Sequence, residues 1–266
     1  MKKLVLITVH GMGATKENFS EELESGLAER IGGQWPQVSV QPVWYSPVFQ
    51  VNEDKLWQSL AGEPSNDLDS TALRKLFLFG FADAAAFERS AHVERETYLQ
   101  VQSLIREALE KGFRACGGDP ATPVVVVANS LGGQVFSSYA WDAQNGRYIH
   151  AQRSDDAALE DFVRLKTWRR FFTTGCNIPI FTAGLRRRVN FARPAGLQWD
   201  NFYDPDDVLG WPLRQLDPDG QTYDWVRDRS ISAGNFLTGW NPASHLGYWS
   251  DKDVLNPVAQ SIQSLL

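Results

Sequence analysis

The chain has 266 residues, 43% of them hydrophobic, and a formal net charge of -6. One large α/β domain accommodates this length, so no second domain is required. The acidic balance attracts no polyanion, and we expect no nucleic-acid partner. The two cysteines are too few for a disulfide framework and favour a reduced, cytoplasmic setting.

The first predicted strand is the apolar run from Leu4 to Val9, of the kind that is buried on both faces of a parallel sheet. The run is too short to span a membrane and no small-residue cleavage site follows it, so we expect no stable membrane anchor. Apolar residues at every fourth position predict a helix over 19–31, capped by Asn18 and ended by Gly32. Residues 38–46 predict a second strand.

The segment 47–90 is less regular than its surroundings. It combines the polar stretch "GEPSNDLDS" with the apolar patch "LFLFGFADAAAF". We interpret it as an insertion that could act as a cap or lid over a pocket. An additional core helix and a surface for a partner protein are the alternatives.

The remainder of the chain alternates between helical and strand patterns. The periodicity predicts helices over 96–113, after Gly132 and over 254–266, and strands over 124–128, 171–181 (with its turn), 197–203 and, weakly, within 223–232. This alternation predicts an α/β fold, in which helices flank a mostly parallel central sheet and residues 1–266 form a single domain.

Candidate functional residues follow the predicted strands, because active sites of open parallel sheets lie beyond the carboxyl ends of the strands. His-Gly-Met-Gly at 10–13 follows the first strand, and Asn-Ser-Leu-Gly-Gly at 129–133 follows the valine run. Asp-Pro-Asp-Asp stands at 204–207, and Ser-His at 244–245. A serine, acids and a histidine therefore occur in that chain order.

Ser130 is the candidate nucleophile. The small residues Ala128 and Gly132 allow a sharp strand-turn-helix that exposes a serine hydroxyl. Serine needs a base, which His245 can supply, and a carboxylate to orient that base. Small residues end many strands, and a single late histidine is more often structural, but the combination favours catalysis. The backbone N–H groups of Met12 and Leu131 would then bind the oxyanion.

These motifs together resemble the α/β-hydrolase superfamily, in its serine esterase and lipase branch. They are "HGMG" (10–13), "ANSLGG" (128–133), "FYDPDDVLGWPL" (202–213) and "SHLGYW" (244–249). The resemblance implies an α/β-hydrolase fold with a catalytic triad of Ser130, Asp207 and His245, in which Asp204 is the rival acid. It also implies an oxyanion hole formed by the N–H groups of Met12 and Leu131.

Two residues depart from the family pattern. Ala128 stands where glycine is usual, and Asn129 stands where histidine is frequent. Neither departure removes a catalytic group, although Asn129 makes the substrate class harder to predict.

The expected activity is hydrolysis of a small-molecule carboxylic ester with an apolar acyl part, through an acyl-enzyme and without cofactor or metal. The same triad could instead act on thioesters or amides or transfer the acyl group, and a ligand-binding protein could retain an unused triad. We interpret His10 as a brace for its turn rather than as a proton acceptor. Four tryptophans are placed where they could line an acyl pocket, namely Trp44, Trp57, Trp211 and Trp240.

Overall fold

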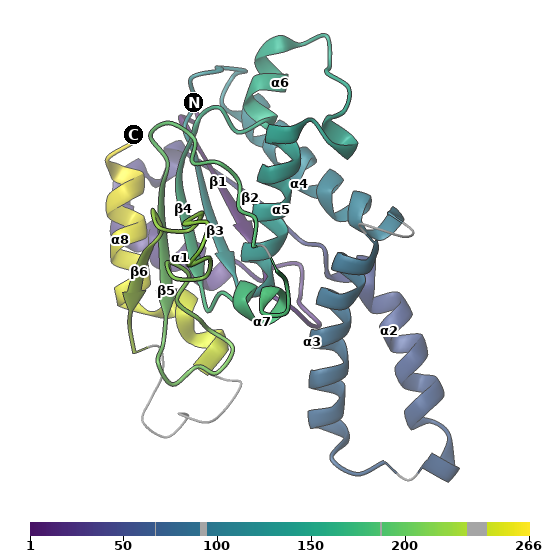
Figure 1. The fold of residues 1–266 in the computed structure, drawn as a ribbon. Helices are drawn as coiled ribbons and strands as arrows, with labels where there is room; N and C mark the ends of the chain where they lie inside the picture. The colour runs from purple at the N-terminus through teal and green to yellow at the C-terminus, as the bar shows by residue number, and fades with distance from the viewer. Residues whose placement is uncertain (67, 91–94, 187, 233–243) are drawn as a thin grey trace.

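The computed structural model describes residues 1–66, 68–90, 95–186, 188–232 and 244–266 (Figure 1). Six parallel strands form one sheet in the order β2-β1-β3-β4-β5-β6. Their bounds are β1 (Leu4–Val9), β2 (Val38–Val43), β3 (Val124–Asn129), β4 (Trp168–Thr174), β5 (Gln198–Tyr203) and β6 (Arg227–Ser230). The predicted fold class, α/β with a parallel central sheet, is confirmed.

The continuous apolar runs form strands because both faces of the sheet are covered. Successive side chains of a strand point to opposite faces. Val5, Ile7 and Val9 accordingly join one buried cluster, while Leu4 and Leu6 join the other. The valines of β3 divide in the same way. A half-exposed strand would instead show alternation of apolar and polar residues.

Two layers of helices enclose the sheet (Figure 1). The first and last helices, α1 (Glu21–Ile31) and α8 (Lys252–Gln263), cover one face. The other face is covered by α4 (Glu96–Ala115), α5 (Leu131–Asn145) and α6 (Ala157–Val163). The two cores therefore lie on either side of β1 and β3, the strands that lead to the candidate site.

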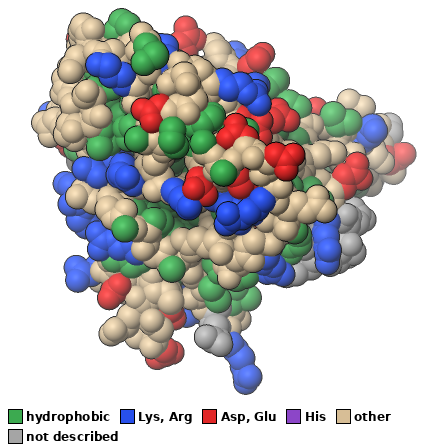
Figure 2. Space-filling model, turned by 90° about the horizontal axis from the view of Figure 1, so that it is seen from above, with side chains coloured by type: hydrophobic (Ala, Val, Ile, Leu, Met, Phe, Trp, Pro, Cys, Tyr) green, Lys and Arg blue, Asp and Glu red, His purple; other side chains and the backbone are tan. Residues whose placement is uncertain are grey.

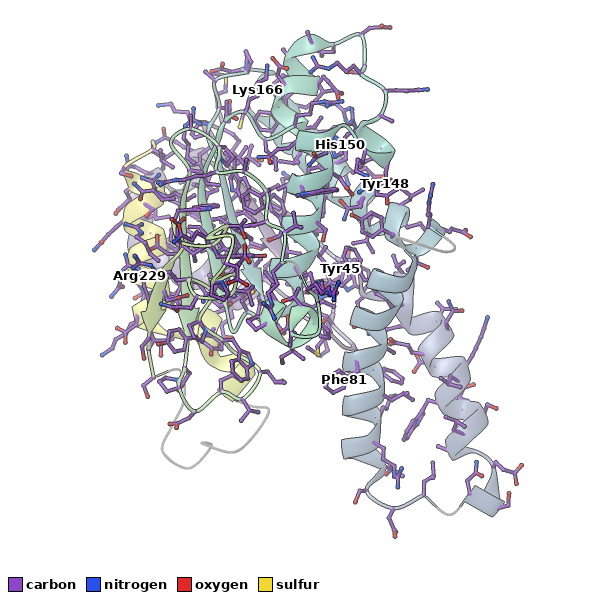
Figure 3. The ribbon with its side chains drawn as sticks, viewed as in Figure 1. Tyr45, Phe81, Tyr148, His150, Lys166 and Arg229 are labelled. Carbon is purple, nitrogen blue, oxygen red and sulfur yellow. The ribbon has the colours of Figure 1, made fainter. Side chains whose placement is uncertain are left out.

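The segment predicted as an insertion forms a helical hairpin. It consists of α2 (Ser46–Ala61), the short η2 (Pro64–Asn66) and α3 (Thr71–Ser90). The hairpin extends beyond the carboxyl ends of the strands, as Figure 1 shows. The hairpin exposes apolar side chains, among them Phe81 on α3, which is 42% exposed (Figure 3). Whether the hairpin moves as a lid stays a prediction.

Several boundaries differ from the sequence-based expectation. The N-cap residue of α1 is Ser20, and Asn18 instead donates a hydrogen bond to the carboxylate of Glu21 at 2.7 Å. The helix ends at Gly32 as predicted, with φ at 60°. The strand and turn predicted over 171–181 correspond to β4, which ends at Thr174, and to the residues that follow it. The short elements not predicted are α6, η2, α7 (Ile178–Thr182), η1 (Gly32–Gln37), η3 (Tyr148–His150) and η4 (Ser244–Ser250).

The last strand is polar, which explains the weak pattern over 223–232. β6 has the sequence Arg-Asp-Arg-Ser and lies at one edge of the sheet. Arg227 and Arg229 form ion pairs with the buried carboxylate of Asp200 on β5, at 2.5 and 2.6 Å. These ion pairs and the strand ladder, rather than apolar burial, fix β6 against β5.

The surface carries mixed charge. Basic and acidic side chains are interspersed on the face seen in Figure 2, with apolar side chains between them. Cys116 and Cys176 are both buried and form no disulfide. No helix in the described part of the chain is long and apolar enough to cross a membrane.

Candidate active site

The predicted strand-turn-helix around Ser130 is present. β3 ends at Asn129, α5 begins at Leu131, and Ser130 between them has φ 51° and ψ -122°. A non-glycine residue in this region costs on the order of 1–3 kcal/mol and persists only where its surroundings hold it. The N–H of Ser130 donates to the carbonyl of Thr174 on β4 at 2.8 Å. The strained serine is therefore anchored to the neighbouring strand.

Gly132 permits α5 to start directly against the end of β1. A Cβ atom at this position would lie 2.4 Å from the carbonyl oxygen of His10 and 2.7 Å from that of Val9. Both neighbours are backbone atoms and cannot turn away. The same close packing brings Gly11 over Ser130, because a Cβ on Gly11 would lie 2.9 Å from the Cβ of Ser130. The His-Gly-Met-Gly loop thus passes over the serine.

The role predicted for His10 is confirmed. Its Nε2 accepts hydrogen bonds from the backbone N–H groups of Tyr45 and Ser46, at 3.1 and 3.2 Å. Its Nδ1 therefore carries the proton and donates it to the carbonyl of Gly11 at 2.6 Å. Burial lowers the pKa of His10 to about 4. A neutral imidazole with both nitrogens engaged braces the loop and is not available as a base.

The two predicted oxyanion donors are unengaged. Among the described residues, neither the N–H of Met12 nor that of Leu131 donates a hydrogen bond. Leu131 is the first residue of α5, where N–H groups have no partner within the helix and favour negative charge. A pocket of about 140 Å³ is lined by Ser130 and Met12, with His10, Asn129 and Trp249 around them.

Asn177 is a site residue that sequence reasoning missed. It is completely buried in the turn between β4 and α7, and its Nδ2 donates to the hydroxyl oxygen of Ser130 at 3.2 Å. Its Oδ1 accepts no hydrogen bond from any described residue. The neighbouring Cys176 is no rival nucleophile, because burial raises the pKa of its thiol to about 12.

The predicted acids lie in the turn after β5, and both are buried. One Asp207 oxygen accepts from the N–H of Leu209 at 2.9 Å, and the other accepts from the hydroxyl of Tyr248, also at 2.9 Å. The Tyr248 hydroxyl in turn accepts the N–H of Asp204 at 2.9 Å. The Asp204 carboxylate closes its own turn by accepting the N–H of Asp206. Both carboxylates thus accept an N–H within the turn, and that of Asp207 also accepts the hydroxyl of Tyr248 from another segment.

The backbone of His245 belongs to η4, and the position of its side chain is outside what the structure describes. Two later residues of η4 show where this segment lies. Tyr248 contacts Asp207, and Trp249 lines the Ser130 pocket and donates from its indole N–H to the hydroxyl of Thr174 at 3.2 Å. The segment that carries His245 therefore bridges the acid turn and the serine.

The prediction that tryptophans line an acyl pocket beside Ser130 is wrong for Trp44, Trp57 and Trp211. The indole of Trp44 donates to the carbonyl of Thr15, Trp57 lines a separate apolar hollow on the hairpin, and Trp211 is 45% exposed. Trp240 lies outside the described residues. The tryptophan that lines the Ser130 pocket is Trp249.

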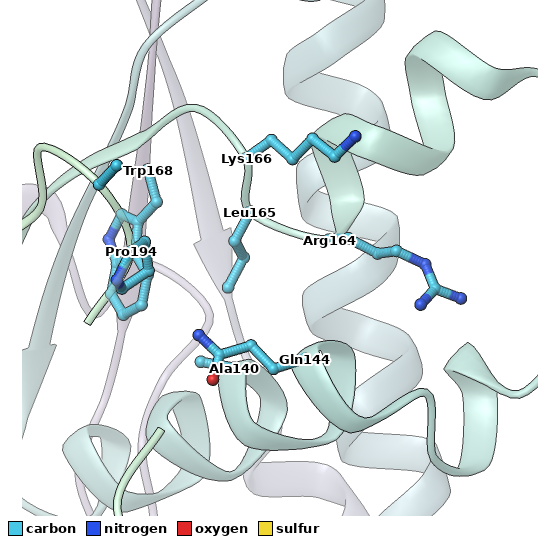
Figure 4. Close-up of a pocket in the computed structure, with 8 residues that line it drawn as sticks. Ala140, Gln144, Arg164, Leu165, Lys166, Trp168 and Pro194 are labelled. Carbon is cyan, nitrogen blue, oxygen red and sulfur yellow. The ribbon is translucent and has the colours of Figure 1, made fainter. Parts of the chain in front are cut away.

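A second hollow, of about 260 Å³, lies at the amino end of β4, between Trp168 and Gln144 (Figure 4). It therefore lies at the amino ends of the strands, whereas Ser130 follows a carboxyl end. Open parallel sheets bind substrates at the carboxyl ends. Within the described ranges, no group of three or more His, Cys, Asp or Glu side chains could hold a metal ion.

No protein-family model and no curated protein matches the chain. Solved structures do. A cutinase-like protein from Cryptococcus sp. is 12% identical over 99% of this chain and 95% of its own, with a TM-score of 0.43. A protein of the α/β hydrolase superfamily from Xanthomonas campestris pv. campestris is 14% identical over 98% of both chains, with a TM-score of 0.44. An acetyl xylan esterase is 15% identical over 99% of both chains, with a TM-score of 0.41.

Similarity at this level carries no argument about activity. The chain's own parallel sheet, with its strained serine between β3 and α5, has the architecture of the α/β-hydrolase fold.

Proposed function

We propose that the protein is a serine hydrolase that cleaves carboxylic esters. The observation that carries this proposal is the strained Ser130, which lies beneath a loop with one unengaged backbone donor and beside a helix N-terminus with another. Strain of this kind is retained at functional sites when the surrounding structure enforces it. An ordinary strand-to-helix junction would not need it.

In the proposed reaction, the oxygen of Ser130 attacks the ester carbonyl and its proton passes to His245. The carbonyl oxygen gains the negative charge and accepts hydrogen bonds from the N–H groups of Met12 and Leu131. When the intermediate collapses, the bond to the alcohol oxygen breaks and the alcohol leaves with the proton from His245. Water then attacks the acyl-enzyme with the same base, which releases the acid and restores the serine.

Asp207 is the acid that we assign to His245. Its carboxylate accepts the hydroxyl of Tyr248 from the η4 segment, which also carries His245, whereas the same hydroxyl meets Asp204 at the backbone N–H. Asn177 supports the nucleophile, because an N–H donated to the serine oxygen stabilises negative charge there and leaves the serine proton free to point elsewhere.

The small pocket favours short acyl groups. Its volume of about 140 Å³ is below the roughly 300–1,000 Å³ of pockets that enclose drug-sized ligands. We therefore infer that acetyl to butyryl esters react faster than long-chain esters.

The test is hydrolysis of p-nitrophenyl esters of increasing acyl length by the wild type, Ser130→Ala and the control Ser138→Ala, which alters another serine on α5. Loss of a triad serine lowers kcat by a factor on the order of 10⁶, and the control should keep its activity. Labelling by a fluorophosphonate should likewise require Ser130. A wild type that neither hydrolyses esters nor labels would contradict the proposal and favour a ligand-binding role.

A further inference from the structure

Two buried carboxyl groups meet at the base of the helical hairpin. Asp83 on α3 and Glu53 on α2 are 2% and 7% exposed. One Asp83 oxygen accepts the N–H of Gly13, in the His-Gly-Met-Gly loop, at 2.6 Å. No N–H or hydroxyl donor of the described residues reaches either oxygen of Glu53, and its polar neighbour is Asp83.

Two buried carboxyl groups resist being ionised together, and a hydrogen bond between Glu53 and Asp83 requires a proton on one of them. The N–H of Gly13 stabilises negative charge on Asp83, which places the proton on Glu53. Burial, and then the carboxylate of Asp83, raise the pKa of Glu53 to about 9. The other titratable groups nearby bring no positive charge to the pair. Asp54 is acidic and forms an ion pair with Lys75. Tyr45 is neutral, because burial raises the pKa of its hydroxyl.

The hairpin also packs on the loop itself. Gly80 lies one helical turn before Asp83 and faces the same way. A Cβ on Gly80 would lie 2.7 Å from the sulfur of Met12. α3 therefore contacts Met12 at Gly80, and its Asp83 accepts a hydrogen bond from Gly13.

These contacts fix both peptide planes that flank Met12. The carbonyl of Gly11 accepts from Tyr45 and His10, on the inner side of the loop. In a trans peptide the N–H of Met12 must point the opposite way. The following peptide is held by Asp83 through the N–H of Gly13, where φ is +87°, a conformation that favours glycine.

We propose that Asp83 and Glu53 act as a pair of positioning residues that share one proton and hold the Met12–Gly13 peptide, so that the α2–α3 hairpin sets the oxyanion hole. The effect on catalysis rests on the proposed function, whereas the bond between the pair and Gly13 does not. When Glu53 loses its proton, two adjacent negative charges repel each other, and the hydrogen bond between Asp83 and the Gly13 N–H weakens.

The first arm of the test is kinetic. The kcat and KM for a short p-nitrophenyl ester are measured from pH 6 to 10 in the wild type, Glu53→Gln, Asp83→Ala, Asp83→Asn and the control Asp54→Asn. In the wild type kcat should fall with an apparent pKa near 9, and in Glu53→Gln, whose amide cannot ionise, this fall should disappear. Asp54→Asn should keep the fall.

For Asp83→Ala, kcat at pH 7 should fall by roughly 10- to 100-fold with KM within about twofold, because a misplaced oxyanion donor costs up to about 10²–10³. Asp83→Asn keeps an acceptor for Gly13 and should recover part of this loss. An unchanged kcat in folded Asp83→Ala, or the same alkaline fall in Glu53→Gln, would overturn the proposal.

The second arm does not depend on turnover. The chain has two methionines, and Met12-Gly13 is its one Met-Gly pair. Labelling with carbonyl-¹³C methionine and ¹⁵N glycine therefore gives a single carbonyl-linked amide signal, that of Gly13. Its chemical shift should titrate near pH 9 in the wild type and not in Glu53→Gln. A signal that does not move in the wild type would refute the shared proton, even if the protein proves to have no esterase activity.

Discussion

The hydroxyl of Tyr248 joins the two aspartates of the acid turn. It donates to Asp207 and accepts from the N–H of Asp204, both at 2.9 Å, and the side chain is completely buried. Tyr248→Phe removes one oxygen and keeps the ring, so no large cavity forms. The variant leaves a buried carboxylate without one donor and a buried N–H without its acceptor.

Each buried polar group left without its partner costs about 1–3 kcal/mol. Two such groups give an expected loss of about 3 kcal/mol in the free energy of unfolding. For a chain of this size the melting temperature shifts by roughly 2 °C per kcal/mol, so Tyr248→Phe should lower Tm by about 6 °C.

Urea unfolding and thermal melting of Tyr248→Phe beside Tyr203→Phe provide the measurement. Tyr203 ends β5, is half-buried, and its hydroxyl bonds to no described residue. Its loss should change the unfolding free energy by less than about 0.5 kcal/mol. Equal effects of the two substitutions would refute the reasoning, because the two variants differ in the hydrogen bonds that they remove.

Three further predictions test the site. Asp207→Asn should lower kcat for ester hydrolysis by on the order of 10⁴ and Asp204→Asn by less than tenfold, and the reverse order would reassign the acid. Gly132→Ala should lower the free energy of unfolding in urea by about 1–3 kcal/mol. The clash of the new Cβ with the His10 carbonyl outweighs a helix-propensity gain of about 1 kcal/mol, and a more stable variant would contradict this. His10 has a folded pKa of about 4 against 6.5 when unfolded, so the folded state binds fewer protons between these values and its contribution to stability is lost as pH falls. The stability difference between wild type and His10→Gln should therefore shrink by about 3 kcal/mol from pH 6.5 to 4, and a constant difference would show that this histidine is not buried in its neutral form.

The sheet was predictable where burial on both faces leaves an uninterrupted apolar run, as in β1 and β3. It was poorly predictable in β6, whose Arg-Asp-Arg-Ser sequence is stabilised by ion pairs with Asp200 that no local pattern reveals. The N-cap of α1 was misplaced because Asn18 and Ser20 are both residue types that suit a cap, and Ser20 holds the position without a side-chain cap hydrogen bond.

The elbow at Ser130 could be predicted because its requirements are local, namely small neighbours and a strand followed by a helix. Asn177 was not singled out, because it lies in the turn after β4 and no motif distinguishes it there. Asp83 lies in no motif, and Tyr248 lies in "SHLGYW" without a role that the motif implies. Their contacts with Gly13 and Asp207 span 70 and 41 residues, so only the folded chain brings them together.

Because the first helix packs on the last, the fold cannot be completed until the chain is almost fully synthesised. α1 packs so closely on α8 that a Cβ on Gly26 would lie 2.7 Å from Leu255, and Arg30 bonds to Asn256 at 2.8 Å. About 220 residues separate the two helices, which at ribosomal speed is roughly 10–45 s. For that interval α1 can pack on Leu4 and Leu6 of β1, but the surface around Gly26 that α8 covers is left open. The segment that carries His245 is synthesised only just before α8, so the proposed triad cannot assemble in a nascent chain that ends soon after Ser130.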